Sequence, residues 1–341
     1  MREPAFWYRP PSSTSRLLAP LGAIYGAITA QRMARAGTRA EIPVLCIGNY
    51  HVGGAGKTPT TLALVKLLRE LGETPFVVSR GYGGSLSGPV CVDQAGHTSA
   101  DVGDEPLMMA AQVPIIVSRD RVAGAALARA QGATVVLLDD GFQNPALVKD
   151  ASLIVIDAAR GLGNGCVFPA GPLRAPLPPQ IARTDGLVVI GSGDAADDVA
   201  AMVSGRGSPV FRARLVPDEV SVNQVSGQRV LAFAGIGDPA RFFTTLRANG
   251  ADMVEQRAFP DHHPFTVEEI EHLVSTAKAR SLMLVTTEKD MARIRSDVRL
   301  RKHADRITAF AVTLSFNDET MLRSFVVAQL ANARARAIRP S

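Results

Sequence analysis

Short, nearly continuous apolar runs alternate with helical stretches through the first two thirds of the chain. The run at residues 42–48 leads into a glycine-rich loop, and a helix is expected over 60–71. Five further runs follow, at residues 76–79, 115–118, 135–138, 153–156 and 187–190. Strands that are apolar on both faces are typical of a parallel sheet covered by helices on both sides. The pattern therefore predicts an α/β domain.

A second α/β pattern follows a more polar, alternating stretch at residues 209–229 and begins with the run at 230–235. It continues with helices over 240–249 and 267–280, strands over 282–286 and 307–312, and a helix over 319–336. We therefore expect an N-terminal helix within 1–36, a larger α/β domain over 37–215 and a smaller α/β domain over 216–341.

The N-terminal helix has an unusual apolar stripe. Its apolar side chains recur at helical spacing between flanking arginines, at Leu17, Leu21, Ile24, Tyr25 and Ile28. The run is shorter than the about 20 residues that span a bilayer, and a proline and two glycines interrupt it. Two placements fit this composition: a helix packed on the protein's own core, and an amphipathic helix lying in a membrane interface.

Composition narrows the class of protein only slightly. The 341 residues are 46% hydrophobic but only 5% aromatic, which is typical of an α/β protein rich in aliphatic residues. The net charge of +5 would suit nucleic acid, an anionic membrane or a phosphorylated substrate. The three cysteines are far apart and lack the spacing of metal ligands, which indicates a reducing compartment.

The glycine-rich loop between the first strand and helix has the composition of a phosphate-binding P-loop. Its backbone N–H groups and the N-terminus of the following helix would hold an anion. Lys57 would reach the β- and γ-phosphates of ATP, and Thr58 would offer a hydroxyl to Mg²⁺. His51 stands where the general pattern has its first glycine. The stretch expected to contact nucleotide consists of His51, Val52, Gly53, Gly54, Ala55, Gly56, Lys57 and Thr58.

Two adjacent carboxylates, Asp139 and Asp140, end the apolar run at 135–138. A carboxylate at such a position is expensive to bury unless it meets a cation. We expect one of the two to order the magnesium ion, directly or through water, although a pair of aspartates could also cap a loop. Either way, the domain over 37–215 is expected to be a P-loop NTPase-like domain.

Two large classes of P-loop protein do not fit. Deviant assembly ATPases carry a lysine five positions before the P-loop lysine, where this chain has Val52. GTPases recognise guanine with N-K-x-D, whereas residues 286–290 read T-T-E-K-D, with the lysine directly before the aspartate.

Several further segments occur together in one order and spacing. They read G-N at 48–49, S-R-G-Y-G-G at 79–84, G-D-E-P at 103–106, D-D-G-F-Q at 139–143, P-A-G-P-L-R at 169–174, F-A-G-I at 233–236, F-P-D-H-H at 259–263 and T-T-E-K-D at 286–290. From about residue 5 to residue 325, the chain closely resembles the tetraacyldisaccharide 4′-kinase family.

The resemblance implies a kinase that uses ATP and Mg²⁺ and has two α/β domains around a cleft. Such an enzyme transfers the γ-phosphate of ATP to the 4′-hydroxyl of the tetraacyldisaccharide 1-phosphate lipid A precursor, forming lipid IVA. The resemblance also implies that Asp104 acts on the attacking hydroxyl together with His262. A carboxylate tuned by histidine is a suitable proton acceptor. Taken alone, G-D-E-P would equally suit a helix N-cap.

Further polar residues in the matching segments are candidates for ligand contacts. Arg119 and Gln143 are expected at the nucleotide, because a guanidinium suits phosphate oxygens. The candidates for the lipid substrate are Asn49, Arg80, Tyr82 and Arg174.

The resemblance also bears on partners and location. An acylated glucosamine disaccharide phosphate must be met at a bilayer surface, which favours interfacial docking of the N-terminal helix. We expect a peripheral protein at the cytoplasmic face of the bacterial inner membrane, with no nucleic acid among its partners. Two other functions remain to be compared with this one: a nucleotide-gated, membrane-associated assembly ATPase, and a soluble kinase of a small molecule.

Overall fold

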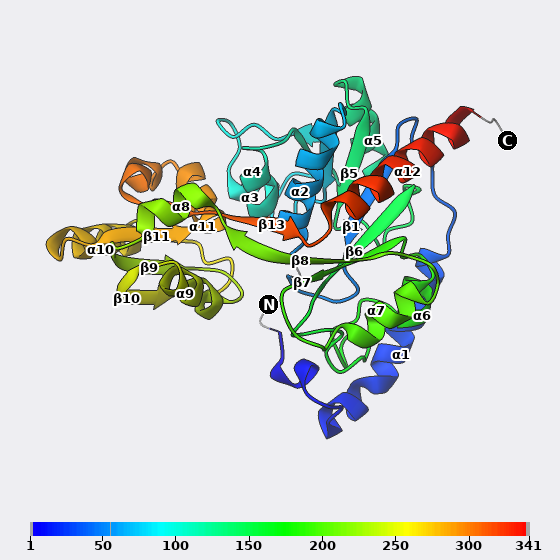
Figure 1. Ribbon diagram of the computed structural model, residues 1–341, viewed down its shortest axis with the longest axis horizontal. Helices are drawn as coiled ribbons and strands as arrows, with labels where there is room; N and C mark the ends of the chain where they lie inside the picture. Colours follow the sequence, from blue (N-terminus) through cyan, green and yellow to red (C-terminus); the bar gives the residue numbers. More distant parts are fainter. Residues whose placement is uncertain (1–2, 55, 339–341) are drawn as a thin grey trace.

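The computed structural model of the chain describes residues 3–54 and 56–338, and a nine-stranded sheet is the largest element in these ranges (Figure 1). Seven neighbouring strands of this sheet are parallel, and an antiparallel strand lies at each edge. From edge to edge the strands are β13 (Val312–Phe316), β8 (Val210–Pro217), β7 (Gly186–Ile190), β6 (Ala151–Asp157), β1 (Val44–Gly48), β5 (Val135–Asp139), β2 (Pro75–Ser79), β4 (Ile115–Val117) and β3 (Val90–Cys91).

Helices cover both faces of the large sheet. Alternate residues of one strand enter different apolar clusters: Leu45 and Ile47 of β1 belong to one, and Cys46 to the other. The first cluster includes α2 (Lys57–Glu70) and α12 (Glu319–Ile338), and the second includes α5 (Arg121–Ala130) and α7 (Asp197–Ser204). Short helices α3 (Ser99–Val102), α4 (Asp104–Met109) and α6 (Leu177–Ile181) complete this unit. The predicted α/β fold with a parallel sheet is confirmed.

A second, smaller sheet has its four strands all parallel. Its strands, in spatial order, are β10 (Asp252–Ala258), β9 (Arg229–Ala234), β11 (Met283–Thr287) and β12 (Thr308–Phe310). The helices of this unit are α8 (Glu219–Val225), α9 (Pro239–Ala248), α10 (Val267–Ala279), α11 (Glu288–Ser296) and the 3₁₀ helix η2 (Arg301–Arg306). Strand β10 was not predicted from the sequence, because this edge strand has no fully buried residue and therefore no continuous apolar run.

The end of the chain returns to the large sheet, which differs from the expected assignment of all of 216–341 to the smaller domain. Strand β13 pairs with β8, and the buried face of α12 packs into an apolar cluster of the large sheet. The physical reason is that Leu322, Val326 and Leu330 complete this cluster. The two connections between the units lie together, and the Asp218 N–H of one donates to the Ala311 carbonyl of the other at 3.1 Å.

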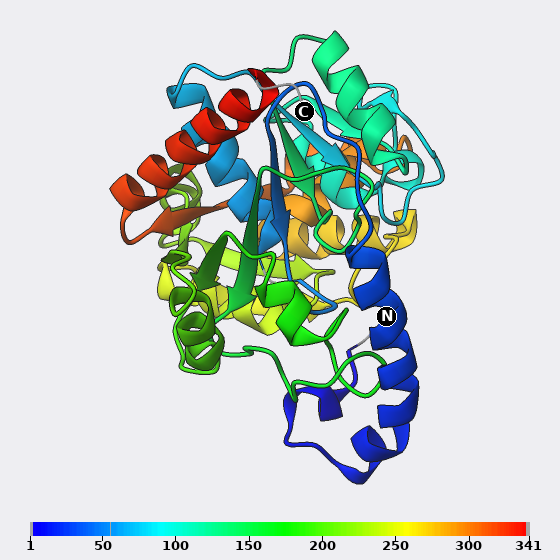
Figure 2. The ribbon, with the colours of Figure 1, turned by 90° about the vertical axis from the view of Figure 1, so that its right-hand side faces the viewer.

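The N-terminal segment consists of the 3₁₀ helix η1 (Ala5–Tyr8) and helix α1 (Ser13–Met33), which lies at the periphery of the molecule (Figure 2). The small residues Gly22 and Gly26 are buried against the loop of residues 167–176. The apolar stripe lies on the other side and is largely exposed, with Leu17 79% and Ile24 60% accessible. Within the residues described, no helix combines the length and the apolar character needed to cross a bilayer.

Candidate active site

The carboxyl ends of three adjacent parallel strands, β1, β5 and β2, bring the P-loop and the acidic pair to one edge of the large sheet. Ile47 of β1 lies beside Asp139 of β5, and Ser79 ends β2. Ligands of open parallel sheets bind outside this edge, where loops and helix N-termini meet. The chain therefore places the predicted nucleotide residues where such a sheet binds its ligand.

The P-loop turns tightly into α2. Gly56 caps this helix with φ of 87°, a left-handed conformation that a side chain would strain. An added Cβ would also lie 2.6 Å from the Cδ1 atom of Ile190. The Lys57 ammonium lies 3.7 Å from Oδ1 of Asp140. Ala55, which the sequence analysis placed in the loop, lies outside the described residues.

Asp139 and Asp140 have different surroundings. Asp139 is buried; the Ser79 hydroxyl donates to Oδ2 at 3.1 Å, and Oδ1 has no partner among the described residues. Burial, with the nearby charges of Glu105 and Asp140, raises the pKa of Asp139. Burial would also raise the pKa of Asp140, but the charges of Lys57 and Arg174 outweigh it and lower this pKa to about 2. Arg174 donates to Asp140 at 2.6 Å.

These groups fit a magnesium site. Mg²⁺ prefers oxygen ligands and commonly takes one or two carboxylates together with substrate phosphates and water. The unpartnered Oδ1 of Asp139 is a buried acceptor that a cation would satisfy, and the Thr58 hydroxyl lies at the start of the adjoining helix. The described residues contain no group of three or more His, Cys, Asp or Glu side chains placed to hold a metal ion by themselves.

Side-chain amides form hydrogen bonds with the backbone of the P-loop and of the residues just before it. The Asn49 side chain donates to the Gly53 carbonyl at 2.9 Å, and Gln143 donates to the Asn49 carbonyl at 2.8 Å. His51 is also buried; its Nδ1 atom lies 3.1 Å from the Val52 carbonyl, and its Nε2 atom has no partner among the described residues. In this structure Asn49 and Gln143 support the loop backbone, and their predicted ligand contacts remain predictions.

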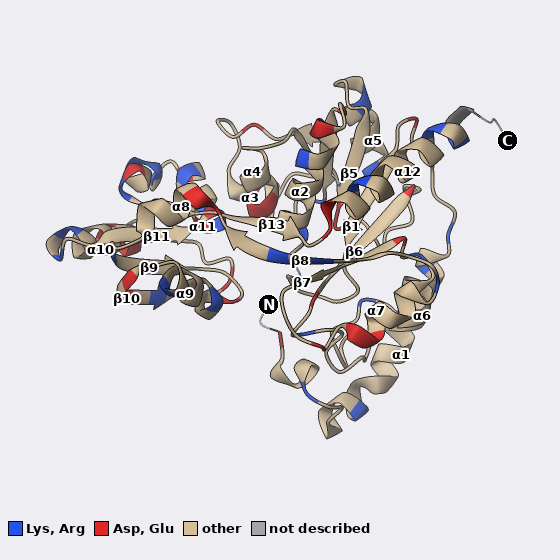
Figure 3. Cartoon of the chain, in the orientation of Figure 1, with Lys and Arg blue, Asp and Glu red and all other residues tan. Residues whose placement is uncertain are grey.

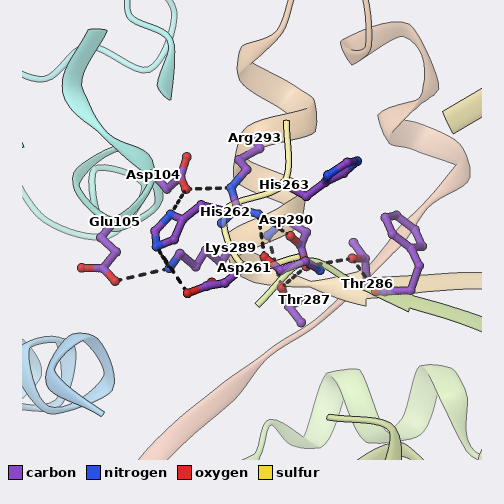
Figure 4. Close-up of polar contacts among 12 residues, drawn as sticks. Asp104, Glu105, Asp261, His262, His263, Thr286, Thr287, Lys289, Asp290 and Arg293 are labelled. Carbon is purple, nitrogen blue, oxygen red and sulfur yellow. Dashed lines mark hydrogen bonds and ion pairs between the residues drawn. The ribbon is translucent and has the colours of Figure 1, made fainter. Parts of the chain in front are cut away.

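The structure brings Asp104 and His262 together, although 158 positions separate them in the sequence (Figure 4). Asp104 is the first residue of α4, and His262 lies in the loop after β10. The Nδ1 atom of His262 lies 2.7 Å from Oδ2 of Asp104. The His262 backbone has φ of 59°, an uncommon value for a residue with a side chain, and its N–H donates to the Gly235 carbonyl at 3.1 Å.

Two cations from α11 contact this pair, and neither was predicted from the sequence as a site residue. Arg293 donates through Nε to Oδ2 of Asp104 at 2.7 Å. The Lys289 ammonium lies 3.3 Å from Nε2 of His262 and 3.4 Å from a Glu105 oxygen. The only available signal was that Lys289 belongs to the T-T-E-K-D segment; Arg293 lies three residues beyond it.

The remaining predicted contacts lie on loops that follow β2 and β4. Arg80, Tyr82 and Arg119 are exposed, and no side-chain hydrogen bond or ion pair joins them to another described residue. By contrast Arg121, which the sequence analysis did not single out, is buried near Asp139 and donates to the Ser118 carbonyl at 2.5 Å. Burial lowers the pKa of Arg121, and the charge of Asp139 partly offsets this.

Comparison with known proteins gives matches over nearly the whole chain. A family model described as tetraacyldisaccharide-1-P 4′-kinase, LpxK, matches residues 14–331. A tetraacyldisaccharide 4′-kinase of Rhodopseudomonas palustris (strain BisB5) is 63% identical over 98% of this chain and 99% of its own length. One of Nitrobacter hamburgensis is 64% identical over 98% of this chain and 100% of its own length.

A solved structure agrees with these matches. It is described as the "apo" form of LpxK from Aquifex aeolicus in complex with ATP. Its TM-score is 0.71 at 25% sequence identity, and the likeness covers 93% of this chain and 99% of that one.

Proposed function

This chain belongs to the tetraacyldisaccharide 4′-kinase family, and on that basis we propose which of its residues perform the transfer and where it takes place. The chain is an ATP-dependent kinase that phosphorylates the lipid A precursor at the 4′ position. The alternative of an assembly ATPase without lipid phosphorylation is not favoured by these relatives. The product of the reaction is lipid IVA.

The observation that carries the proposed residue roles is the contact between Asp104 and His262. Asp104 accepts the proton of the 4′-hydroxyl while the hydroxyl oxygen bonds to the γ-phosphorus. The bond from this phosphorus to the β,γ-bridging oxygen breaks, and ADP leaves with the electron pair. His262 donates through Nδ1 to Oδ2 of Asp104 and so fixes the carboxylate that acts as the base.

The P-loop supplies the donor half of the reaction. Lys57 and the backbone N–H groups of the loop neutralise and orient the phosphates, which is most of the catalysis in phosphoryl transfer. Thr58 and one or both of Asp139 and Asp140 would hold Mg²⁺, which neutralises phosphate charge when it is bound. Arg174 and Lys57 both contact Oδ1 of Asp140. The exposed Arg80, Tyr82 and Arg119 remain available for ligand contacts.

The test of the base assignment is transfer of label from γ-labelled ATP to the tetraacyldisaccharide 1-phosphate in detergent micelles. We expect Asp104→Ala to abolish transfer and to leave nucleotide binding intact. Asp252→Asn, which replaces an exposed carboxylate on β10, serves as the control. If Asp104→Ala keeps nearly the wild-type turnover, Asp104 is not the base.

Helix α1 is the proposed contact with the membrane. Its buried Gly22 and Gly26 face the rest of the protein. The residues of its apolar stripe are between 39% and 79% exposed: Leu17, Leu21, Ile24, Tyr25 and Ile28. Burying an aliphatic side chain of this kind contributes about 1.5–3 kcal/mol when it is fully exposed beforehand. Residues 13–33 contain no acidic side chain, and Figure 3 shows basic residues toward the ends of the helix.

Insertion of this stripe would place the enzyme on the surface where its acylated substrate resides. Basic residues beside it add about 1 kcal/mol each on an anionic surface. We therefore propose a peripheral protein at the cytoplasmic face of the bacterial inner membrane, with the lipid substrate reaching the site from the bilayer. Contacts of Gly22 and Gly26 with residues 167–176, and of Met33 with an apolar cluster of the large sheet, support a position of α1 on the unit that carries the P-loop.

Co-sedimentation with vesicles of phosphatidylglycerol and phosphatidylcholine tests this placement. Leu17→Asp and Ile24→Asp should each reduce the bound fraction strongly while ATP binding stays unchanged. Val220→Asp is the matched control, because Val220 is a similarly exposed apolar residue, 64% accessible, on α8. Equal binding of all three variants and the wild type would exclude α1 as the docking element.

A further inference from the structure

Two residues of the smaller unit hold Asp104 of the large unit through the same oxygen atom. His262 and Arg293 both contact Oδ2 at 2.7 Å, and neither contacts Oδ1 (Figure 4). Within the described residues, no hydrogen-bond donor is found on Oδ1. Asp104 lies on α4 of the large unit, whereas His262 and Arg293 belong to the smaller unit. The arrangement leaves one carboxylate oxygen available and fixes the other.

Arg293 is itself held rigidly from its far side. Its NH1 atom donates to Oδ1 of Asp290 at 2.6 Å and to the Gly235 carbonyl at 3.0 Å. Asp290 is fully buried, and it also accepts from the Gly235 N–H at 3.0 Å and from the Thr287 hydroxyl at 2.8 Å. The guanidinium is therefore fixed relative to the ends of β9 and β11 before it meets Asp104.

The ion pair with Asp290 already compensates the buried charge of Arg293. A side chain that served only the smaller unit would need no second carboxylate. Its Nε–H instead crosses to the large unit and reaches Asp104, and the Arg293 side chain is only 6% exposed there. The planar guanidinium suits this double contact because its donors point in fixed, divergent directions.

We propose that Arg293 is a positioning residue for the transfer: it holds Oδ2 of Asp104 across the two units, so that Oδ1 faces the acceptor hydroxyl. The inference rests on the proposed role of Asp104 as the base. It adds that the base is competent only when the smaller unit is seated against α4, because both residues that orient it come from that unit. A misplacement of about 1 Å in such a group lowers turnover by about 100-fold.

The same contact affects the charge of the base. Burial would raise the pKa of Asp104, but the hydrogen bond from His262 and the charge of Arg293 outweigh it and lower this pKa. The other charged groups nearby lie beyond these two partners: Lys289 and Asp261 beside the His262 ring, and Glu105 beside Lys289. Loss of the Arg293 charge therefore raises the pKa of Asp104 and protonates the base at higher pH.

The experiment compares Arg293→Gln, Arg293→Lys and Asp290→Asn in the lipid transfer assay across pH. For Arg293→Gln we expect kcat to fall by about 10- to 100-fold, with KM for ATP unchanged. The acid limb of its kcat/KM profile should move to higher pH. Arg293→Lys keeps the charge and should recover part of kcat with less movement of the limb. Asp290→Asn neutralises the other carboxylate that contacts Arg293 but leaves the Nε contact with Asp104, so it should lower stability without moving the acid limb to higher pH.

A purely structural role for Arg293 predicts something different, namely loss of activity in proportion to unfolded protein and an unmoved acid limb in every variant. That result overturns the inference, and so does a folded Arg293→Gln protein with wild-type kcat and an unmoved limb. If Arg293→Gln does not fold, Arg293→Lys decides, because its single ammonium cannot make both contacts and kcat must fall in folded protein. Failure of the base assignment is recognised separately, by turnover of Asp104→Ala.

Discussion

The buried imidazole of His51 makes the stability of this protein depend on pH in a way that one substitution removes. His51 is 2% exposed, and burial lowers its pKa from 6.5 to about 4. The hydrogen bond to the Val52 carbonyl opposes this decrease in pKa but does not overcome it, and the charges of Lys57 and Arg174 lower the pKa further. The neutral ring donates from Nδ1 to this carbonyl, which leaves Nε2 buried as an acceptor without a partner among the described residues.

The sign and size of the effect follow from proton linkage. Because the folded pKa is depressed, the unfolded chain binds a proton first, and folding becomes less favourable as the pH falls below 6.5. The difference of about 2.5 between the two pKa values corresponds to about 3.4 kcal/mol once the pH is below both. Between pH 7.5 and pH 5 the same two values give a loss of about 2 kcal/mol.

The assay is chemical denaturation of the wild type and of His51→Asn at both pH values, without nucleotide. The asparagine amide can still donate to the Val52 carbonyl and cannot take up a proton in this range. Other titrating groups affect both proteins equally, so the difference in unfolding free energy isolates His51. His272→Asn, on the exposed face of α10, controls for replacing a histidine as such.

We expect the free-energy advantage of the wild type over His51→Asn to shrink by about 2 kcal/mol on going from pH 7.5 to pH 5. A difference that stays constant to within about 0.5 kcal/mol, the usual limit of additivity, would refute the reasoning. In that case the ring would have to be solvated or partnered in the folded protein.

Three further substitutions test other parts of the structure. Gly22→Val on α1 would place its Cβ 2.8 Å from the Val167 carbonyl oxygen and should destabilise the protein by about 1–3 kcal/mol in denaturation, whereas Ala27→Val on the exposed side should not. Leu330→Ala on α12 should lower the free energy of unfolding by about 2–5 kcal/mol and reduce the thermal stability of the large unit. Met321→Ala on the same helix should have little effect, because the Met321 side chain is exposed. Thr58→Ala should raise the Mg²⁺ concentration needed for half-maximal transfer, and an unchanged value would remove Thr58 from the metal site.

The core of the large sheet was predictable because its strands are buried on both faces. Such strands give continuous apolar runs, and β1, β2, β5 and β6 were all expected near their observed positions. Strand β10 left no such signal, since this edge strand has only half-buried and exposed positions, in irregular order. The return of β13 to the large sheet was equally hidden, because pairing between distant strands leaves no local pattern.

Some residues of the candidate site could likewise be predicted from local sequence patterns, and others could not. The P-loop and the acidic strand end are local patterns whose chemistry could be inferred from the residues alone. The pairing of Asp104 with His262 came only from the family resemblance, since no spacing connects residues so far apart. Arg293 gave no signal, because an arginine three residues after an aspartate on a helix usually indicates a surface ion pair. Its second contact depends on how the two units meet.

The smaller unit is an insertion between β8 and β13, with both of its connections joined by the hydrogen bond from Asp218 to Ala311. The large unit therefore begins to be synthesised before the smaller unit but is completed after it. Most strands of the large sheet leave the ribosome early, yet Leu314, Leu322 and Val326 of its core are made after the whole insertion. The large unit can therefore complete its apolar core only after β13 and α12 have left the ribosome. Truncation at the C-terminus should accordingly damage the nucleotide site at the opposite end of the sequence before it affects the insertion.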